Sequence, residues 1–341
     1  MTLSRQPAMR LVVLTGVAVF LMLPGCRASL PDQAIPKPGT YYQTTPLRYR
    51  LAARTYLVHV PRDYSEERAC PLILVLHGAF STAEDIEKWS GFSDLADREG
   101  FVVAYPNGIG LFGFLQHWNA GHCCGRAKAD SVDDVVFLNY VIRDISDRLR
   151  IDAGRIYVVG HSNGGMLAYC YAAQESGRVA GIGVVAGSIG SSESEREPPS
   201  RVGPPERAVP LIAVHGRDDE NVPFEGGSGL RSGKQRYISV LDSVESWARY
   251  AGCERAPEVR EDPEGAQRIM TWRDGEGKAL AVLHILDGWG HVWPGTSFTR
   301  RLPEDHPLRP FQASRIIWDF LRTHTQLLTD NDLAALANAG R

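Results

Sequence analysis

The stretch Arg155-Ile-Tyr-Val-Val-Gly-His-Ser-Asn-Gly164 decides the fold, because in it an apolar run leads directly into a Gly-x-Ser-x-Gly turn. The run 155–159 predicts a buried strand, and the helix formers of 165–174 predict a helix after the turn. A serine on such a sharp turn has a strained backbone, and the flanking glycines leave room for close packing. The pattern therefore predicts a nucleophile elbow that raises Ser162 into a cleft. The alternative is a glycine-rich turn whose serine only caps a helix.

A serine alone is a weak nucleophile, so the elbow requires a carboxylate and then a histidine further along the chain. Residues 210–216 predict a second buried strand, and the acidic turn 217–223 follows it. A third apolar run, 281–286, leads into a glycine-rich loop that presents His291. Because parallel strands end at one edge of a sheet, these groups are expected beside the serine. Composition does not choose among the acidic residues of the turn, and the alternative for His291 is a purely structural role.

An oxyanion hole needs two backbone amides, one directly after the nucleophile and one from the loop after an earlier strand. Asn163 is the candidate for the first amide. Residues 71–76 predict a strand that ends in His77-Gly78-Ala79-Phe80, which suggests Ala79 for the second amide and Phe80 as the reserve. We expect His77 to orient this turn and to take no part in acid-base chemistry.

Helical patterns alternate with the apolar runs. In residues 132–149, apolar side chains recur at helical spacing, with Ser131 and Asp134 as a near capping box. The Asp133-Asp134 doublet is interpreted as helix-start electrostatics. Shorter helices are predicted at 93–99, 242–250 and 311–323. The alternation predicts an α/β domain with a doubly wound, mostly parallel sheet and helices on both faces.

The domain is expected to span residues 47–326. Two segments fall outside the alternating pattern. Residues 191–208 form a polar, proline-containing excursion, and residues 327–341 form a C-terminal tail that is alanine-rich from residue 328. Both are expected to be mobile.

Several blocks of sequence resemble one family: Leu76-His-Gly78, Trp118-Asn-Ala-Gly-His-Cys-Cys-Gly125, Val132-Asp-Asp-Val135, Gly160-His-Ser-Asn-Gly-Gly-Met166, His215-Gly-Arg-Asp-Asp-Glu-Asn-Val-Pro223 and Gly290-His-Val-Trp-Pro-Gly295. They are similar to the secreted esterases that include poly(3-hydroxybutyrate) depolymerase-like proteins and feruloyl or acetylxylan esterases, and most similar to the mycobacterial-type lipoprotein branch. The resemblance extends from about Tyr56 to Leu321.

This resemblance implies the α/β-hydrolase fold and an esterase activity. The family's catalytic acid lies four residues after the histidine of the His215 block, which indicates Asp219 and leaves Asp218 as a surface neighbour. Many relatives have cysteine directly after the His-Gly pair, where this chain has Ala79. Since only a backbone amide is needed there, the departure does not threaten activity.

The sequence thus predicts a serine carboxylic ester hydrolase that acts through an acyl-enzyme, with Ser162, Asp219 and His291 as its triad. A serine peptidase of the same fold and a non-catalytic surface lipoprotein are the alternatives. No cofactor and no metal are expected, because the chain has neither His-Glu-x-x-His nor Cys-x-x-Cys spacing.

Composition is that of an ordinary globular chain of 341 residues, 43% hydrophobic and with a net charge of −3. This even charge argues against a nucleic-acid partner. We expect a monomer whose partner is a small or oligomeric ester substrate.

The N-terminus predicts export. Arg5 and Arg10 precede the apolar run 11–23, which is short for a membrane span but suits a signal peptide, predicted at 1–26. Leu23-Pro-Gly-Cys26 resembles the bacterial lipobox, so Cys26 is the predicted lipidation site, with simple cleavage as the alternative. The proline-rich segment 27–46 is expected to be a tether, and a lipid anchor the only membrane attachment. The predicted location is the cell envelope, periplasm or exterior.

With Cys26 set aside, the six cysteines leave an odd number, so at least one is unpaired within the chain. An oxidising compartment favours one or two disulfides among Cys70, Cys123, Cys124 and Cys253; the adjacent pair could each take a separate partner, and the sequence leaves the connectivity open. Cys170 is expected to be a buried apolar residue of the helix after the elbow.

Aromatic residues in loops are expected at the rim of the site: residues 111–115, Trp118, Trp289 and Trp293. We take Trp118 and Trp293 as candidate substrate contacts, with core packing as the alternative. Such a rim accepts feruloyl groups, acetylated sugars and hydroxyalkanoates alike, so the substrate stays open.

Overall fold

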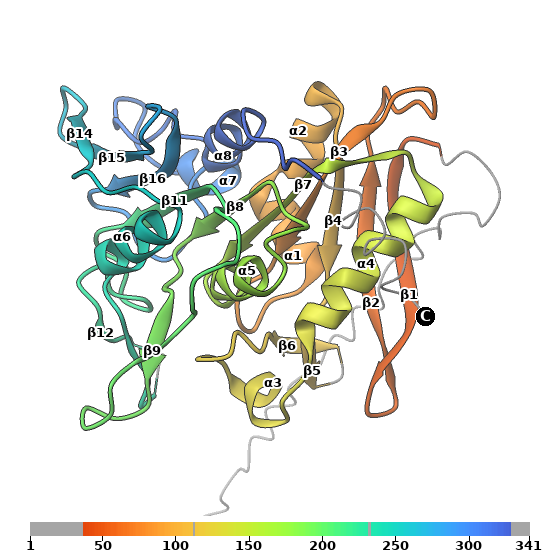
Figure 1. Ribbon diagram of the computed structural model, residues 1–341, viewed down its shortest axis with the longest axis horizontal. Coiled ribbons are helices and arrows are strands. Elements are labelled where there is room, and N and C mark those ends of the chain that lie inside the picture. Colours follow the sequence, from red (N-terminus) through yellow and green to blue (C-terminus); the bar gives the residue numbers. More distant parts are fainter. Residues whose placement is uncertain (1–36, 112, 231–232, 329–341) are drawn as a thin grey trace, which may run out of the picture.

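The computed structural model describes residues 37–111, 113–230 and 233–328, which build a twisted ten-stranded sheet with helices packed against it (Figure 1). The strand order is β1-β2-β4-β3-β7-β8-β11-β16-β15-β14. Neighbours from β4 to β16 are parallel, and antiparallel pairs flank them on both sides. The strands are β1 (Gly39–Tyr49), β2 (Ala52–Val60), β3 (Cys70–Leu76), β4 (Val102–Pro106), β7 (Ile151–His161), β8 (Gly181–Val185), β11 (Leu211–Gly216), β14 (Glu258–Glu261), β15 (Gln267–Arg273) and β16 (Ala279–Leu286).

Side chains of the central strands alternate between two apolar cores, one on each face of the sheet. In β3, Leu72 and Leu74 enter one core while Ile73 and Val75 enter the other. Because strands buried on both faces have no solvent side, they appear in the sequence as continuous apolar runs. The strands predicted around 71–76, 155–159, 210–216 and 281–286 are all present.

Helices cover both faces, as predicted. Residues of α4, α5 and α6 pack in one core, and those of α1, α2 and α8 pack in the other. The mostly parallel, doubly wound α/β architecture is therefore confirmed. The helices are α1 (Ala83–Ser90), α2 (Phe92–Glu99), α3 (Gly125–Ala129), α4 (Asp134–Arg148), α5 (Asn163–Gln174), α6 (Val240–Tyr250), α7 (Thr296–Thr299) and α8 (Ala313–Leu321).

The two aspartates at the start of α4 have different roles. Asp133 is the N-cap, and its side chain accepts a hydrogen bond from the Val136 amide. Asp134, in contrast, is 2% exposed and pairs with the buried Arg54 at 2.7 Å. Helix-start electrostatics therefore describes Asp133 only. Asp134 instead joins the helix to β2, because a carboxylate buried this deeply needs a cationic partner.

The first strand corrects the predicted domain boundary. Residues 39–46 were expected in the tether, but they belong to β1, which pairs with β2 along most of its length. The threonines and tyrosines of 40–45 favour a strand. Pro46 lies within the register shift between Thr44 and Arg48, where the ladder is interrupted. The folded domain thus begins near Gly39 instead of residue 47.

A small second sheet lies beside the large one, with the order β10-β9-β13-β12. The excursion 191–208, expected to be mobile, contributes to it and so is part of the fold. Strand β9, where the excursion starts, pairs with β13 more than forty residues further along the chain, and no local sequence pattern reveals this pairing. The short strands are β9 (Gly190–Ser192), β10 (Ser200–Arg201), β12 (Gly227–Ser228) and β13 (Arg236–Tyr237), with a separate hairpin of β5 (Ile109–Leu111) and β6 (Phe114–His117).

Among the described residues, no helix is long and apolar enough to cross a bilayer. The predicted signal peptide at 1–26, its Cys26, the first ten residues of the tether and residues 329–341 of the tail lie outside the described residues.

Candidate active site

Strand β7 ends at His161 and helix α5 begins at Asn163, so Ser162 occupies the turn between them. Its φ of 53° lies in the left-handed region, a costly conformation for a residue with a side chain. Glycine is required on both sides of the turn. A Cβ at Gly160 would lie 2.2 Å from backbone atoms of Gly164, and one at Gly164 would lie 2.5 Å from the His77 carbonyl oxygen. The strand, turn and helix predicted from the sequence are therefore present.

Ser162, His291 and Asp219 form one hydrogen-bonded chain. His291 Nδ1 lies 2.7 Å from Asp219 Oδ2, and His291 Nε2 lies 2.9 Å from Ser162 Oγ. An ionised carboxylate only accepts, so Nδ1 carries the hydrogen and Nε2 accepts from the serine hydroxyl. The three residues follow the carboxyl ends of β7, β11 and β16, the edge expected from the parallel strands.

Asp219 is buried and is held as an anion. It is 3% exposed, and its Oδ1 accepts hydrogen bonds from the amides of Asn221 and Val222, both at 2.9 Å. Its Oδ2 lies 3.2 Å from His215 Nε2, in addition to its bond with His291. Burial alone would raise the pKa of Asp219, but the hydrogen bonds from these histidines outweigh it and hold the pKa well below its usual range. Asp218 is exposed.

The two candidate oxyanion residues flank the serine. Ala79 lines the same cavity as Ser162, and a Cβ on the preceding Gly78 would lie 3.3 Å from the serine Cβ. The Phe80 amide, the reserve candidate, donates to the Gln116 carbonyl at 2.8 Å and is therefore occupied. Asn163 opens α5, where backbone amides have no partner within the helix.

His77 anchors the Ala79 turn. Its Nε2 accepts from the Gly108 amide at 2.9 Å, so Nδ1 carries the hydrogen and donates to the Gly78 carbonyl at 2.7 Å. Burial lowers the pKa of His77 to about 4, which keeps the ring neutral near neutral pH. Both ring nitrogens are thus engaged by the backbone, in agreement with an orienting role for this histidine.

Trp118 and Trp293, the predicted substrate contacts, are buried, and the prediction is wrong for both. Trp118 is 0% exposed, and its indole donates to the His77 carbonyl at 2.9 Å. Trp293 is 1% exposed, and its indole donates to Ser314 Oγ at 3.2 Å. An indole whose N–H finds a protein partner can enter the core, and sequence patterns do not reveal that partner.

The cavity in front of the serine has a volume of about 240 Å³. Its walls contain residues that sequence reasoning missed, among them Tyr237 of the small sheet, Gln235 directly before it, and Cys124 and Gly125 at the start of α3. The lining residues are Ala79, Phe80, His117, Cys124, Gly125, Ser162, Asn221, Val222, Gln235, Tyr237 and His291.

Cys123 and Cys124 form a disulfide with each other instead of taking separate partners, a pairing that the sequence left open. Cys70, Cys170 and Cys253 are free and buried. Burial raises the pKa of Cys70 and that of Cys170 to about 11, so both remain thiols at neutral pH. Cys170 lies in α5, in agreement with the apolar role expected for it.

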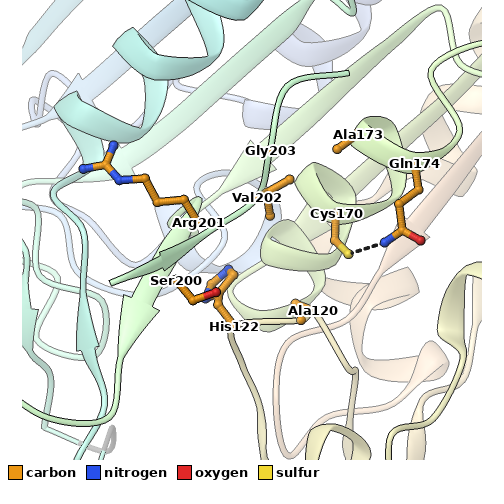
Figure 2. A pocket seen from close by; sticks show the side chains of 10 residues that line it. Ala120, His122, Cys170, Ala173, Gln174, Ser200, Arg201, Val202 and Gly203 are labelled. Carbon is orange, nitrogen blue, oxygen red and sulfur yellow. Dashed lines mark hydrogen bonds between the residues drawn. The ribbon is translucent and has the colours of Figure 1, made fainter. Parts of the chain in front are cut away.

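A second cavity of about 200 Å³ lies between α5 and the β10 segment (Figure 2). Cys170 and Gln174 line it from the helix, while His122 lines it from a loop and Ser200 from β10. The Cys170 thiol accepts a hydrogen bond from Gln174 at 3.1 Å, while the Arg201 guanidinium extends away and donates to Ser246 at 3.0 Å. No hydrogen-bonded pair of nucleophile and base is found among its lining residues. In the part of the chain that the structure describes, no group of three His, Cys, Asp or Glu side chains is placed to hold a metal ion.

The chain is also similar to known esterases. Residues 54–196 match the family model described as esterase PHB depolymerase. The putative esterase NocK of Nocardia uniformis subsp. tsuyamanensis is 31% identical over 274 residues, which cover 76% of each chain. Feruloyl esterase B of Piromyces equi is 26% identical over 242 residues, which cover 70% of this chain and 42% of that protein.

Among solved structures, native pOPH superposes with a TM-score of 0.52 at 16% identity, covering 89% of this chain and 94% of that one. At this identity the likeness concerns the fold alone. Fold and site together define an α/β-hydrolase. The chain belongs to the esterase PHB depolymerase family and is a carboxylic ester hydrolase.

Proposed function

We propose that the enzyme hydrolyses carboxylic esters through a serine acyl-enzyme. The observation that carries this proposal is the hydrogen-bonded chain from Asp219 through His291 to Ser162, at the wall of one cavity. His291 Nε2 takes the proton of Ser162 as Oγ attacks the ester carbonyl carbon. Asp219 holds the ring in the required tautomer and stabilises the imidazolium that forms.

The carbonyl oxygen becomes an oxyanion, which the amides of Asn163 and Ala79 stabilise. When the C–O bond to the alcohol breaks, His291 returns its proton to the leaving oxygen. A water molecule then attacks the acyl-enzyme with His291 again as base, which releases the acid and restores Ser162. These steps need no metal or organic cofactor.

Feruloyl, acetyl and hydroxyalkanoate esters are the proposed substrate classes, since similar relatives are named feruloyl and acetylxylan esterases and the matching family model is described as esterase PHB depolymerase. The cavity of about 240 Å³ suits soluble esters and short oligomers. We propose a monomer that acts alone on such esters.

A panel of esters tests the proposal: p-nitrophenyl acetate and butyrate, methyl ferulate, acetylated xylan and hydroxybutyrate oligomers. We expect hydrolysis by the wild-type enzyme, none above background by Ser162→Ala, and covalent labelling by a fluorophosphonate probe only when Ser162 is present. Peptide cleavage without ester cleavage would favour a serine peptidase. A folded protein that neither reacts with the probe nor cleaves any substrate would favour a non-catalytic lipoprotein.

We also propose that the enzyme is exported and anchored through Cys26. The support is the charged start, apolar run and lipobox-like Leu23-Pro-Gly-Cys26 of the sequence. Expression in a bacterium fed with radiolabelled palmitate tests this. The wild-type chain should take up label and fractionate with the envelope, and Cys26→Ala should not. Equal labelling of both would contradict the anchor.

A further inference from the structure

Tyr237 of strand β13 in the small sheet and Gln235, directly before that strand, form one wall of the catalytic cavity. Residues two apart along extended backbone point to the same side, which is why both reach the cavity. Arg236, between them, points away and donates to Glu195 at 2.7 Å and to Ser228 at 3.4 Å. The side that faces the serine is therefore polar, although no charged side chain of this segment lines it.

The orientation of the Gln235 amide follows from its contacts. Its Nε2 donates to the His122 carbonyl at 2.7 Å and to Ser191 Oγ at 2.6 Å. A carbonyl only accepts, so the amide nitrogen must be on this side and Oε1 on the other. Among the described residues Oε1 has no hydrogen-bond donor, and the atom is accessible to solvent. Gln235 thus offers a fixed acceptor to the cavity.

Tyr237 supplies the complementary donor. Its hydroxyl makes no hydrogen bond with any described residue, and it is likewise accessible to solvent. Burial, together with the negative charge of Asp219, raises the pKa of Tyr237 to about 12. The phenol therefore keeps its proton at every pH at which the enzyme would work, and its O–H is available to a ligand.

We propose that the Tyr237 hydroxyl and Gln235 Oε1 recognise a hydroxyl group on the ester substrate. An alcohol accepts one hydrogen bond and donates another, so it satisfies both side chains at once. An ester that places only a hydrocarbon against Tyr237 and Gln235 would displace water from their polar atoms and leave those atoms without a hydrogen-bond partner, which is unfavourable. This inference rests on the proposed function and narrows it to hydroxylated esters. The hydroxyl can belong to the acyl part or to the alcohol part.

Matched esters separate these two sources. Ethyl 3-hydroxybutyrate against ethyl butyrate tests the acyl part, and 2,3-dihydroxypropyl butyrate against propyl butyrate tests the alcohol part. The quantity compared is the ratio of kcat/KM for the hydroxylated ester to that for its plain partner. The main variant is Tyr237→Phe, which removes one oxygen and leaves Gln235 with its two structural hydrogen bonds.

We expect Tyr237→Phe to lower this ratio about tenfold in one of the two pairs, while kcat/KM for the plain esters stays within about twofold. The matched control is Arg236→Gln, whose side chain faces away from the cavity and which should leave both ratios unchanged. Gln235→Leu should lower the same ratio as Tyr237→Phe does. Melting temperatures of the variants check that each remains folded.

Unchanged ratios in both pairs, from a wild-type enzyme that hydrolyses the esters, would overturn the inference and leave the proposed function intact. An equal loss for hydroxylated and plain esters would also overturn it, because it would indicate a structural role for Tyr237. A wild-type protein that hydrolyses none of the esters and resists the fluorophosphonate probe would overturn the proposed function, and this inference with it.

Discussion

Two of the cavities among the described residues are similar in size, about 240 Å³ in front of Ser162 and about 200 Å³ beside α5 (Figure 2), yet of these two only the first holds a hydrogen-bonded nucleophile and base. The first lies where β7, β11 and β16 end, so residues from distant parts of the chain converge there. In the second, the thiol of Cys170 is kept protonated by burial and the Arg201 guanidinium points elsewhere. Volume therefore does not identify the site, whereas the converging strand ends do.

The largest expected effect is the loss of the nucleophile. Ser162→Ala should lower kcat by about 10⁶-fold, because the remaining groups cannot form the acyl-enzyme. Cys170→Ala, the matched change in the second cavity, should leave kcat within about twofold, as an alteration away from the reacting atoms. Hydrolysis of p-nitrophenyl butyrate measures both. A comparable loss in Cys170→Ala, with the fold intact, would remove the distinction between the cavities.

The next effect separates the adjacent aspartates. Asp219→Asn should lower kcat about 10⁴-fold, because an amide no longer fixes the tautomer of His291. Asp218→Asn should change kcat by no more than about twofold, since this side chain is exposed. The same assay with protein of equal melting temperature decides between them. If Asp218→Asn were the inactive variant, the assignment of Asp219 would be wrong.

Acid should destabilise both cavity regions through their buried histidines. Burial lowers the pKa of His77, beside the catalytic cavity, to about 4 and that of His122, at the second cavity, to about 3. Between the unfolded pKa of about 6.5 and these values, the unfolded chain binds a proton that the folded chain does not. Stability is therefore fully present above pH 6.5 and falls as the pH is lowered, by about 3 kcal/mol per histidine at pH 4.

Chemical denaturation from pH 7 to pH 4 measures this fall in unfolding free energy. His77→Gln and His122→Gln should each make it shallower, but only the first should also lower kcat, because His77 holds the Ala79 turn. Identical pH profiles for the wild type and both variants would contradict the burial of neutral rings.

The smallest expected effect concerns the loop of His291. His161 Nε2 donates to the His291 carbonyl at 2.9 Å, and burial lowers the pKa of His161 to about 3. His161→Gln should reduce kcat by about tenfold with little change in KM, because a misplaced base costs rate more than binding. His324→Gln is the control: His324 Nε2 also donates to a carbonyl, that of Ala279, but Ala279 lies at the start of β16, the end of the strand opposite to the one that leads to His291. Equal losses in both would indicate general destabilisation.

A site residue could be predicted from the sequence where a local pattern of neighbouring residues marks it. Ser162 and His291 lie in local patterns of strand, glycine and turn, so both were found from the residues themselves. The choice of Asp219 over Asp218 needed the family resemblance, because a doublet in an acidic turn has no periodicity. The fold was predictable through its apolar central strands, whereas the edge strand β14 is exposed and polar, Glu-Val-Arg-Glu, and resembles a loop.

The misses share a physical cause. Trp118 and Trp293 looked like rim residues because their burial depends on acceptors, the His77 carbonyl and Ser314, that lie far away in the sequence. Gln235 precedes, and Tyr237 ends, a strand of only two residues, which is too short for an alternating sequence pattern to be recognised.

Trp118 has a further consequence for the whole site. Its indole holds the carbonyl of His77 at the start of the Ala79 turn, while its main-chain N–H and carbonyl clasp the side chain of Asn163 at 2.8 Å and 3.1 Å. The two amides proposed for the oxyanion are thereby braced by a single residue that never meets the substrate. The spacing of the two amides is therefore fixed by Trp118, so a ligand that displaces one amide must also displace the other.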